Sequence, residues 1–260
     1  MEISRLYLQQ TENAIEAELR KISTFSAQIA QDNTIHSILE KQDEEISFSE
    51  EYDDMTDLYE TLVNARSLQN VYQIRLFISD SFRFSQSQYI TFPLSEIASE
   101  SWYAELIGQY QTQTILPPHT FRAPLSEPVQ VLSIVTLIRS RNDINRILGV
   151  VSVDIPESDL LEILQRNNYS AQSAAYLVDE NLNIVCRADC DPGLSDAEIS
   201  ALLGQMADQF GTSSGVYSSG ETVAGLSAPV FNGWRVFTVA SFDNLLSSSA
   251  ELRDQMIALT

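Results

Sequence analysis

The residues of this sequence that could do chemistry are mainly carboxylates, because its 260 residues include 36 Asp and Glu against 15 Lys and Arg, two His and two Cys. Residues 211–215 match the letters of a G-x-S-x-G nucleophile motif, but that motif needs a strand before it and a helix after it. Here we expect the opposite order. The carboxylates are numerous enough for a glycosidase-type pair, yet no spacing singles out two of them. The sequence therefore predicts no catalytic residue and no enzyme activity in this chain.

The two cysteines, Cys186 and Cys190, lie close together in the sequence Cys-Arg-Ala-Asp-Cys. They can form a disulfide if the chain turns back between them, which would suit an oxidising compartment. Two free thiols are the alternative. A metal site would need further ligands, but His36 and His119 are distant in sequence and the spacing is not that of a zinc knuckle. We expect neither a metal nor a cofactor.

The net charge of −21 and the pI near 4.2 exclude one class of partner. Phosphate backbones and anionic lipids are bound through Lys and Arg, so this chain should repel both. No nucleic-acid partner is expected. Ten of the acids lie between Glu40 and Glu60 with one base, Lys41. We interpret this stretch as a solvated loop and helix face, because no calcium loop of the Asp-x-Asp-x-Asp-Gly kind is present.

No segment of the sequence is long enough to span a membrane. The longest apolar stretches, 131–138 and 147–153, are far shorter than the ~20 residues that a spanning helix needs. No signal peptide is visible at the start, where polar helical sequence begins at once. The chain could still be a soluble piece of a membrane protein, attached through flanking helices that it lacks.

Residues 2–41 are expected to form one long helix. Leu8, Ile15, Ile22 and Ile29 recur every seven residues, and neither Pro nor Gly interrupts the run. At 1.5 Å per residue such a helix is about 60 Å long. It must therefore run along the body of the protein, along a second copy of the chain, or along both. A homodimer through this helix is plausible in a larger protein, although polar residues in the stripe weaken an isolated coiled coil.

The remainder of the sequence predicts an α+β fold with two antiparallel sheets, each with a few helices. The expected strands are 71–79, 89–92, 129–139, 146–155, 174–178, 183–187, 223–230 and 234–240, and the expected helices are 54–65, 101–108, a connecting helix after Pro156, 195–210 and 242–260. Ser195 and Glu198 form a capping box, and Asn232-Gly233 is a strong hairpin signal. Pro117-Pro118 is expected to break the chain. We divide the sequence into residues 1–65, 66–168, 169–241 and 242–260.

Three motifs occur in an order that is typical of one family. Ser101-Trp102-Tyr103 opens a helix, the apolar run 147–155 closes the first unit, and residues 176–185 open the second. In this order the chain resembles the double-Cache sensor domains of bacterial membrane receptors, with sensor histidine kinases as the nearest type and chemoreceptors second. The resemblance implies two PAS-like units, membrane-distal and membrane-proximal, between a long N-terminal helix and a C-terminal helix that leads to a transmembrane segment.

The same resemblance implies a small-molecule ligand in the distal unit. The amino-acid-binding subgroup has a Tyr and an Arg ahead of its Trp-Tyr pair and an Asp further on. Trp102, Tyr103 and Asp154 match this pattern, whereas Ser95 and Glu100 stand where the Tyr and the Arg would be. Since an α-carboxylate needs that cation or equivalent donors, an amino-acid ligand of the usual kind is not expected.

Each candidate ligand-binding residue also has a structural interpretation. Trp102 and Tyr103 are adjacent on a helix and cannot face the same way, so one should be core and the other can line a pocket. Asp154 either meets the ligand or caps a turn near Pro156. Arg75 and Arg122 either supply donors to an anion or pair with the surplus acids.

These observations predict an extracytoplasmic domain that senses a small molecule for a membrane receptor, most simply a two-component sensor histidine kinase. The alternatives are the sensor domain of a chemoreceptor, a protein that captures a solute without signalling, and an adhesion or scaffold module. In the last case the distal core should be filled by side chains.

Overall fold

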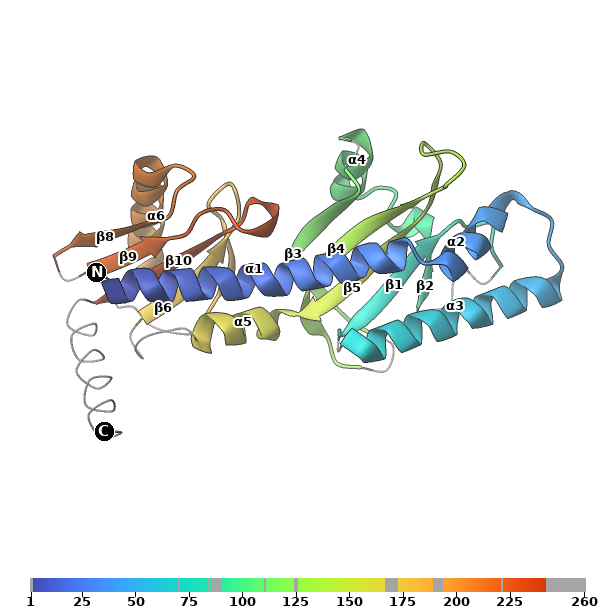
Figure 1. Cartoon of the computed structure of the whole chain (residues 1–260), viewed down its shortest axis with the longest axis horizontal. Helices are drawn as coiled ribbons and strands as arrows, with labels where there is room; N and C mark the ends of the chain where they lie inside the picture. Colours follow the sequence, from blue (N-terminus) through green and yellow to red (C-terminus); the bar gives the residue numbers. More distant parts are fainter. Residues whose placement is uncertain are drawn as a thin grey trace. The chain divides into compact units, whose positions relative to one another are not determined.

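The computed structural model describes residues 2–69, 71–83, 85, 90–109, 111–123, 126–166, 173–188, 194–220 and 222–241, apart from the side chains of Ile3, Asp43 and Ser241. The predicted helix 242–260 lies outside these residues. The chain packs as two units (Figure 1). Lys21–Glu157 forms one around a five-stranded sheet, which we call sheet A. The chain up to Arg20 and from Ser158 onward forms the other around a second five-stranded sheet, sheet B.

The expected single helix over 2–41 is in fact two helices, α1 (Glu2–Ala30) and α2 (Asn33–Leu39). Asp32 causes the break, because its carboxylate accepts hydrogen bonds from the backbone N–H groups of Thr34 (2.8 Å) and Ile35 (3.1 Å). An Asp side chain that caps a new helix competes with continuation of the old one. The apolar stripe predicted on this helix is confirmed, since Leu8, Ile15, Ile22 and Ile29 are almost fully buried.

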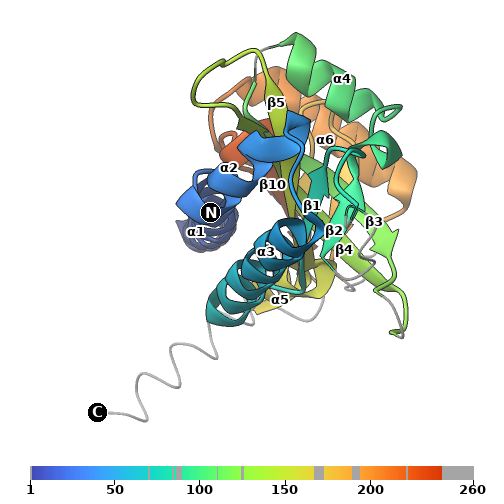
Figure 2. The same ribbon diagram turned by 90° about the vertical axis from the view of Figure 1, so that its right-hand side faces the viewer.

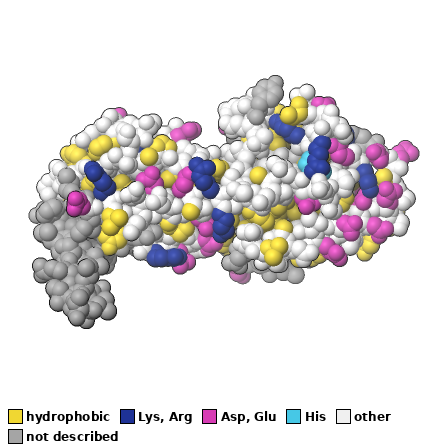
Figure 3. Space-filling model, in the orientation of Figure 1, with side chains coloured by type: hydrophobic (Ala, Val, Ile, Leu, Met, Phe, Trp, Pro, Cys, Tyr) yellow, Lys and Arg dark blue, Asp and Glu magenta, His cyan; other side chains and the backbone are white. Residues whose placement is uncertain are grey.

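A short 3₁₀ turn (Glu40–Asp43) and a long helix α3 (Phe48–Gln69) follow. Most of the acids in this stretch are exposed, as expected, and Figure 3 shows acidic side chains gathered around α3. Glu51 is the exception, with only 4% of its surface exposed. Its carboxylate accepts a hydrogen bond from the backbone N–H of Arg83 and lies 3.5 Å from the guanidinium of the same residue.

Sheet A is built from β1 (Gln73–Ile78), β2 (Thr91–Pro93), β3 (Gln113–Phe121), β4 (Val129–Arg139) and β5 (Ile147–Pro156) in the order β2-β1-β5-β4-β3. All neighbours are antiparallel except β1 and β2, which are parallel. The central strand β5 is buried along nearly its whole length. Its apolar sequence is therefore that of a strand covered on both faces.

The two faces of sheet A meet different elements (Figure 2). On one face lie a 3₁₀ turn (Leu94–Glu96) and the helix α4 (Ser101–Gly108), whose Leu106 packs with Val135 and Leu137 of β4. Thr136 points to the opposite face, where its hydroxyl lies 2.7 Å from that of Ser26 in α1. This alternation along β4 reserves one face of the sheet for α1 and leaves the other to α4.

Pro117 and Pro118 do not break the chain as predicted, because both lie within β3. Two features of this strand make them tolerable. It is at the edge of sheet A, and its pairing with β4 shifts between Leu116 and His119. A proline cannot donate to a strand ladder, so edge strands and bulges are where it can be accommodated.

Sheet B repeats the plan of sheet A. Its strands β6 (Ser173–Val178), β7 (Ile184–Arg187), β8 (Gly215–Ser219), β9 (Thr222–Leu226) and β10 (Arg235–Ser241) have the order β7-β6-β10-β9-β8. In both sheets the fifth strand is central and the first two strands lie on one side of it. The helix α5 (Glu157–Arg166) follows β5, and α6 (Asp196–Phe210) covers one face of sheet B.

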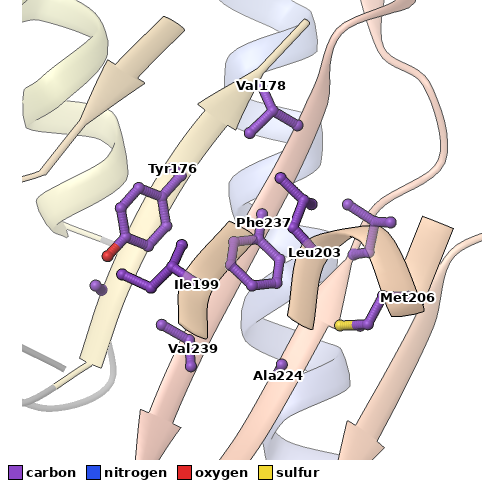
Figure 4. Close-up of a cluster of buried hydrophobic side chains, with 10 residues drawn as sticks. Tyr176, Val178, Ile199, Leu203, Met206, Ala224, Phe237 and Val239 are labelled. Atoms are coloured by element: carbon purple, nitrogen blue, oxygen red, sulfur yellow. The ribbon is translucent and has the colours of Figure 1, made fainter. Parts of the chain in front are cut away.

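The space between α6 and sheet B is filled by side chains (Figure 4). Leu203 and Met206 of α6 pack against Tyr176 of β6 and Phe237 of β10, whose ring centroids are 5.7 Å apart. The predicted capping box at Ser195 is present, with both of its hydrogen bonds. Asn232 and Gly233 adopt positive φ angles of 64° and 77°, as their predicted turn requires.

No helix within the described residues is both long enough and apolar enough to cross a bilayer.

The close contact of Gly149 in β5 with the backbone of β1 gives a stability prediction. A Cβ there would lie 2.5 Å from the carbonyl oxygen of Phe77, so Gly149→Ala should lower the free energy of unfolding by about 1–3 kcal/mol. The control is Gly108→Ala at the end of α4, where a Cβ meets nothing within 4 Å. Urea unfolding of both variants measures the difference, and equal midpoints would contradict the assignment.

Candidate ligand-binding site

A cavity of about 390 Å³ lies against sheet A at the N-terminal end of α4. Its walls come from four strands (β1, β3, β4 and β5) and from the residues around the start of α4. Apolar and aromatic side chains form most of its surface: Phe77, Ile97, Trp102, Leu116, Pro117, Pro118 and Val135. The polar side chains that line it are Arg75, Glu100, His119 and Ser152.

The floor of the cavity is held by a buried ion pair between Arg75 of β1 and Asp154 of β5. The Nε and Nη2 atoms of Arg75 donate to the two carboxylate oxygens at 2.7 and 2.8 Å. Asp154 is completely buried, and 14% of the Arg75 side chain is exposed. The two-point geometry is the strongest that an arginine and a carboxylate can form.

Two hydroxyl groups complete the hydrogen bonding of Asp154. Ser133 of β4 and Ser152 of β5 donate to its Oδ1 atom at 2.5 and 2.9 Å. The strand register explains why these groups meet, since Ser133 lies directly opposite Asp154, and Arg75 opposite Ser152. A buried carboxylate is stable only when it is paired and hydrogen-bonded, and here both conditions are met.

Arg75 is also enclosed by aromatic rings. Its guanidinium carbon lies 4.5 Å from the ring centroid of Phe121 and 5.7 Å from that of Phe77. Such contacts favour a cation over the ring face and fix the orientation of the side chain. Arg75 therefore forms a rigid part of the cavity wall. Of the two roles expected for Arg75, donor to an anion or partner of an acid, the structure shows the pairing with an acid, which is Asp154.

Trp102 and Tyr103 are both half-buried on the face of sheet A that α4 covers. Trp102 lines the cavity, and the Tyr103 ring lies edge-on to it with 5.9 Å between centroids. Burial raises the pKa of the Tyr103 phenol, with the charge of Arg139 opposing this in part. The phenol is thus a neutral hydrogen-bond donor at physiological pH. Which of the two rings meets a ligand stays a prediction.

The other residues singled out from the sequence lie elsewhere. Arg122 is exposed at the end of β3, beyond the cavity walls, and its Nε donates to the carbonyl of Ser126 at 3.2 Å. Cys186 is buried in β7. Cys190 lies outside the described residues, so the disulfide stays a prediction.

Sequence reasoning missed His119, Ser133 and Ser152 as parts of this site. The chain break expected at Pro117-Pro118 would put His119 in a loop, but His119 lies in β3, where the pairing with β4 shifts, and lines the cavity. Ser133 and Ser152 could have been predicted as polar contacts, because a hydroxyl in the middle of an apolar strand needs a hydrogen-bond partner.

The ion pair gives a second prediction. Asp154→Ala leaves a buried guanidinium without its counter-charge, so we expect a loss of about 3–5 kcal/mol in the free energy of unfolding. The double variant Arg75→Leu, Asp154→Leu should lose clearly less than the sum of its single variants, because it leaves no uncompensated charge. Chemical denaturation measures all of these values.

The matched control is the exposed pair of Arg166 and Glu162 in α5, whose side chains are 67% and 69% exposed. Glu162→Ala should cost less than about 0.5 kcal/mol, since water already solvates both groups. A loss at Asp154 no larger than this would refute the structural role of the pair.

Neither a family model nor a curated protein matches the sequence. Several solved structures share its fold. The ligand-binding domain of the Campylobacter jejuni chemoreceptor Tlp3, solved in complex with L-valine, is 15% identical, with a TM-score of 0.60 over 92% of this chain and 91% of that one. The periplasmic sensory domain of Tlp1 from the same organism is 12% identical, with a TM-score of 0.60 over 93% of both chains.

A third similar structure comes from the other receptor class. The extracellular domain of mmHK1S-Z3, assigned as a histidine kinase, is 14% identical, with a TM-score of 0.60 over 95% of this chain and 99% of that one. The likeness extends over nearly the whole described chain and concerns the fold. Together with the repeated sheet order, it confirms the expected α+β fold with two PAS-like units.

Proposed function

We propose that this chain is the extracytoplasmic sensor domain of a transmembrane signalling receptor, and that it binds a small organic molecule in the cavity between α4 and sheet A. The observation that carries the proposal is the cavity itself. Its volume of about 390 Å³ lies within the usual range of small-molecule sites, which are mostly apolar with a few well-placed polar groups. The walls described above have that composition.

The contrast with the other sheet supports this location. In the sheet B unit, aromatic and aliphatic side chains such as Tyr176 and Phe237 fill the space beneath α6. Beneath α4 a cluster around Leu106 also packs on sheet A, but a cavity remains beside it at the start of the helix, which a module with only a scaffolding role would not need. The C. jejuni Tlp3 domain, which shares the fold, was solved with L-valine bound. This supports a small molecule as the class of ligand for the present chain.

A ligand acts as a signal only if it binds one conformation more tightly than another. In this proposal it bridges Trp102 of α4 and the strands of sheet A, and so favours one packing of α4 on the sheet. The opposite face of the sheet is coupled to α1, since the side chain of Gln113 in β3 donates to the hydroxyl of Thr136 and to the carbonyl of Ser23 in α1. A shift of the strands would therefore displace α1 through these hydrogen bonds.

The output of the receptor belongs to the proposal as well. Chemoreceptors and a protein assigned as a histidine kinase occur among the similar structures, and a two-component histidine kinase is our first choice. The membrane attachment would be supplied by helices that flank this chain.

Ligand binding can be tested directly on this chain. A thermal-shift screen of amino acids, organic acids, amines and sugars should yield at least one compound that raises the melting temperature. Trp102→Ala should then weaken the binding of that compound by about tenfold or more, as expected for the loss of a central aromatic contact.

The control is Phe48→Ala, which removes an aromatic side chain that is 62% exposed on α3 and should leave the affinity unchanged. If no compound stabilises the protein, or if binding is the same in the Trp102 variant, ligand sensing through this cavity must be given up.

A further inference from the structure

We infer that the cavity selects an organic cation, a protonated amine with a short apolar body, in preference to an amino-acid zwitterion or a carboxylate. This inference rests on the proposed function and names the chemical class of its ligand. It depends on which charges at the cavity are already compensated by the protein and which are not.

The one cation among the cavity-lining residues is Arg75, and its charge is already compensated. Asp154 holds it by two hydrogen bonds, and the Asp154 carboxylate has no exposed surface. A ligand carboxylate could gain little from this arginine unless it displaced Asp154, which would leave a buried carboxylate unpaired. That displacement is costly, so Arg75 is a poor anchor for an anion.

The anion at the cavity, Glu100, is not compensated. It is exposed at the start of α4 and lines the cavity. Although it occupies the N-cap position, its side chain makes no capping hydrogen bond. Within the described part of the chain it forms no ion pair. Arg75 and Asp154 offset each other, so Glu100 adds a negative charge to the cavity lining, which attracts a cation and repels a carboxylate.

The N-terminus of α4 does not reverse this preference. The positive end of a helix dipole favours an anion, but here the chain places its own carboxylate, Glu100, at that end. A carboxylate from a ligand would meet Glu100 at the same position. The like charges would oppose its binding.

The walls suit the remainder of such a ligand. The rings of Trp102 and Phe77 line the cavity, and aromatic rings attract an ammonium group, most strongly where water is excluded. Leu116, Val135 and Ile97 provide an apolar surface for a short branched carbon chain. The structure therefore points to an amine that places its nitrogen near Glu100 and Trp102.

Three compounds that share a branched four-carbon body test the charge preference: isobutylamine, L-valine and isovalerate. Isobutylamine is L-valine without its carboxylate, and isovalerate is L-valine without its amine. Isothermal titration calorimetry at pH 7 should show isobutylamine binding about tenfold or more tightly than L-valine, with isovalerate weakest, as expected for one unfavourable charge contact.

Substitutions at Glu100 locate the effect. Glu100→Gln should weaken isobutylamine binding by about tenfold, because it removes the charge and keeps the shape. Glu100→Arg should reverse the order in favour of isovalerate and L-valine. Glu96→Gln is the control, since Glu96 is an exposed acid of the preceding 3₁₀ turn outside the cavity, and it should change nothing. Both positions are at the surface, so the melting temperatures of the three variants verify folding.

The outcomes separate this inference from the proposed function. The cation preference is overturned if L-valine or isovalerate binds more tightly than isobutylamine. It is also overturned if Glu100→Gln leaves the affinity for isobutylamine unchanged. Either result leaves the sensor proposal intact. If none of the three binds, the class of the compounds found in the thermal-shift screen decides: cations support the inference, and zwitterions or anions overturn it. If no compound of any class binds, both proposals fail.

Discussion

The organisation of the candidate site depends on one interaction, the buried pair of Arg75 and Asp154. Two strands, β1 and β5, each place a charge on the face of sheet A that α4 covers. Neither charge could remain there alone, because the desolvation free energy of an unpaired buried ion exceeds what its packing contacts contribute. Together, with hydroxyls from Ser133 and Ser152, they form a stable polar floor for the cavity. The pair also decides which charges remain for a ligand.

The two sheets show how one topology can serve two purposes. Both have the strand order second, first, fifth, fourth, third. Beneath α6, large side chains from both the helix and the strands fill the interior. Beneath the shorter α4, a cluster around Leu106 packs on the strands, and a cavity remains at the N-terminal end of the helix between Trp102 and the irregular strand β3. The strand order is the same, but the covering helix is shorter over sheet A, and the edge strand β2 is parallel to its neighbour where β7 of sheet B is antiparallel.

Local sequence features predicted much of the fold. The capping box at Ser195, the Asn232-Gly233 turn and the helix 101–108 all depend on residues close to one another in sequence, and all three are present. The two errors have different causes. The break at Asp32 is a local cap that competes with the apolar stripe, whereas the strand through Pro117 and Pro118 depends on its place at the edge of sheet A. Residue preferences alone could not settle these cases.

The sequence by itself determined most of the element types and the aromatic pair at the start of α4, because periodicity, capping and turn chemistry act over a few residues. Only the tertiary structure decided what those residues do. Arg75 and Asp154 are 79 positions apart, and their pairing follows from strand register, which no local pattern specifies. The position of Glu100 at the cavity, beside an arginine that is already compensated, is likewise a consequence of packing.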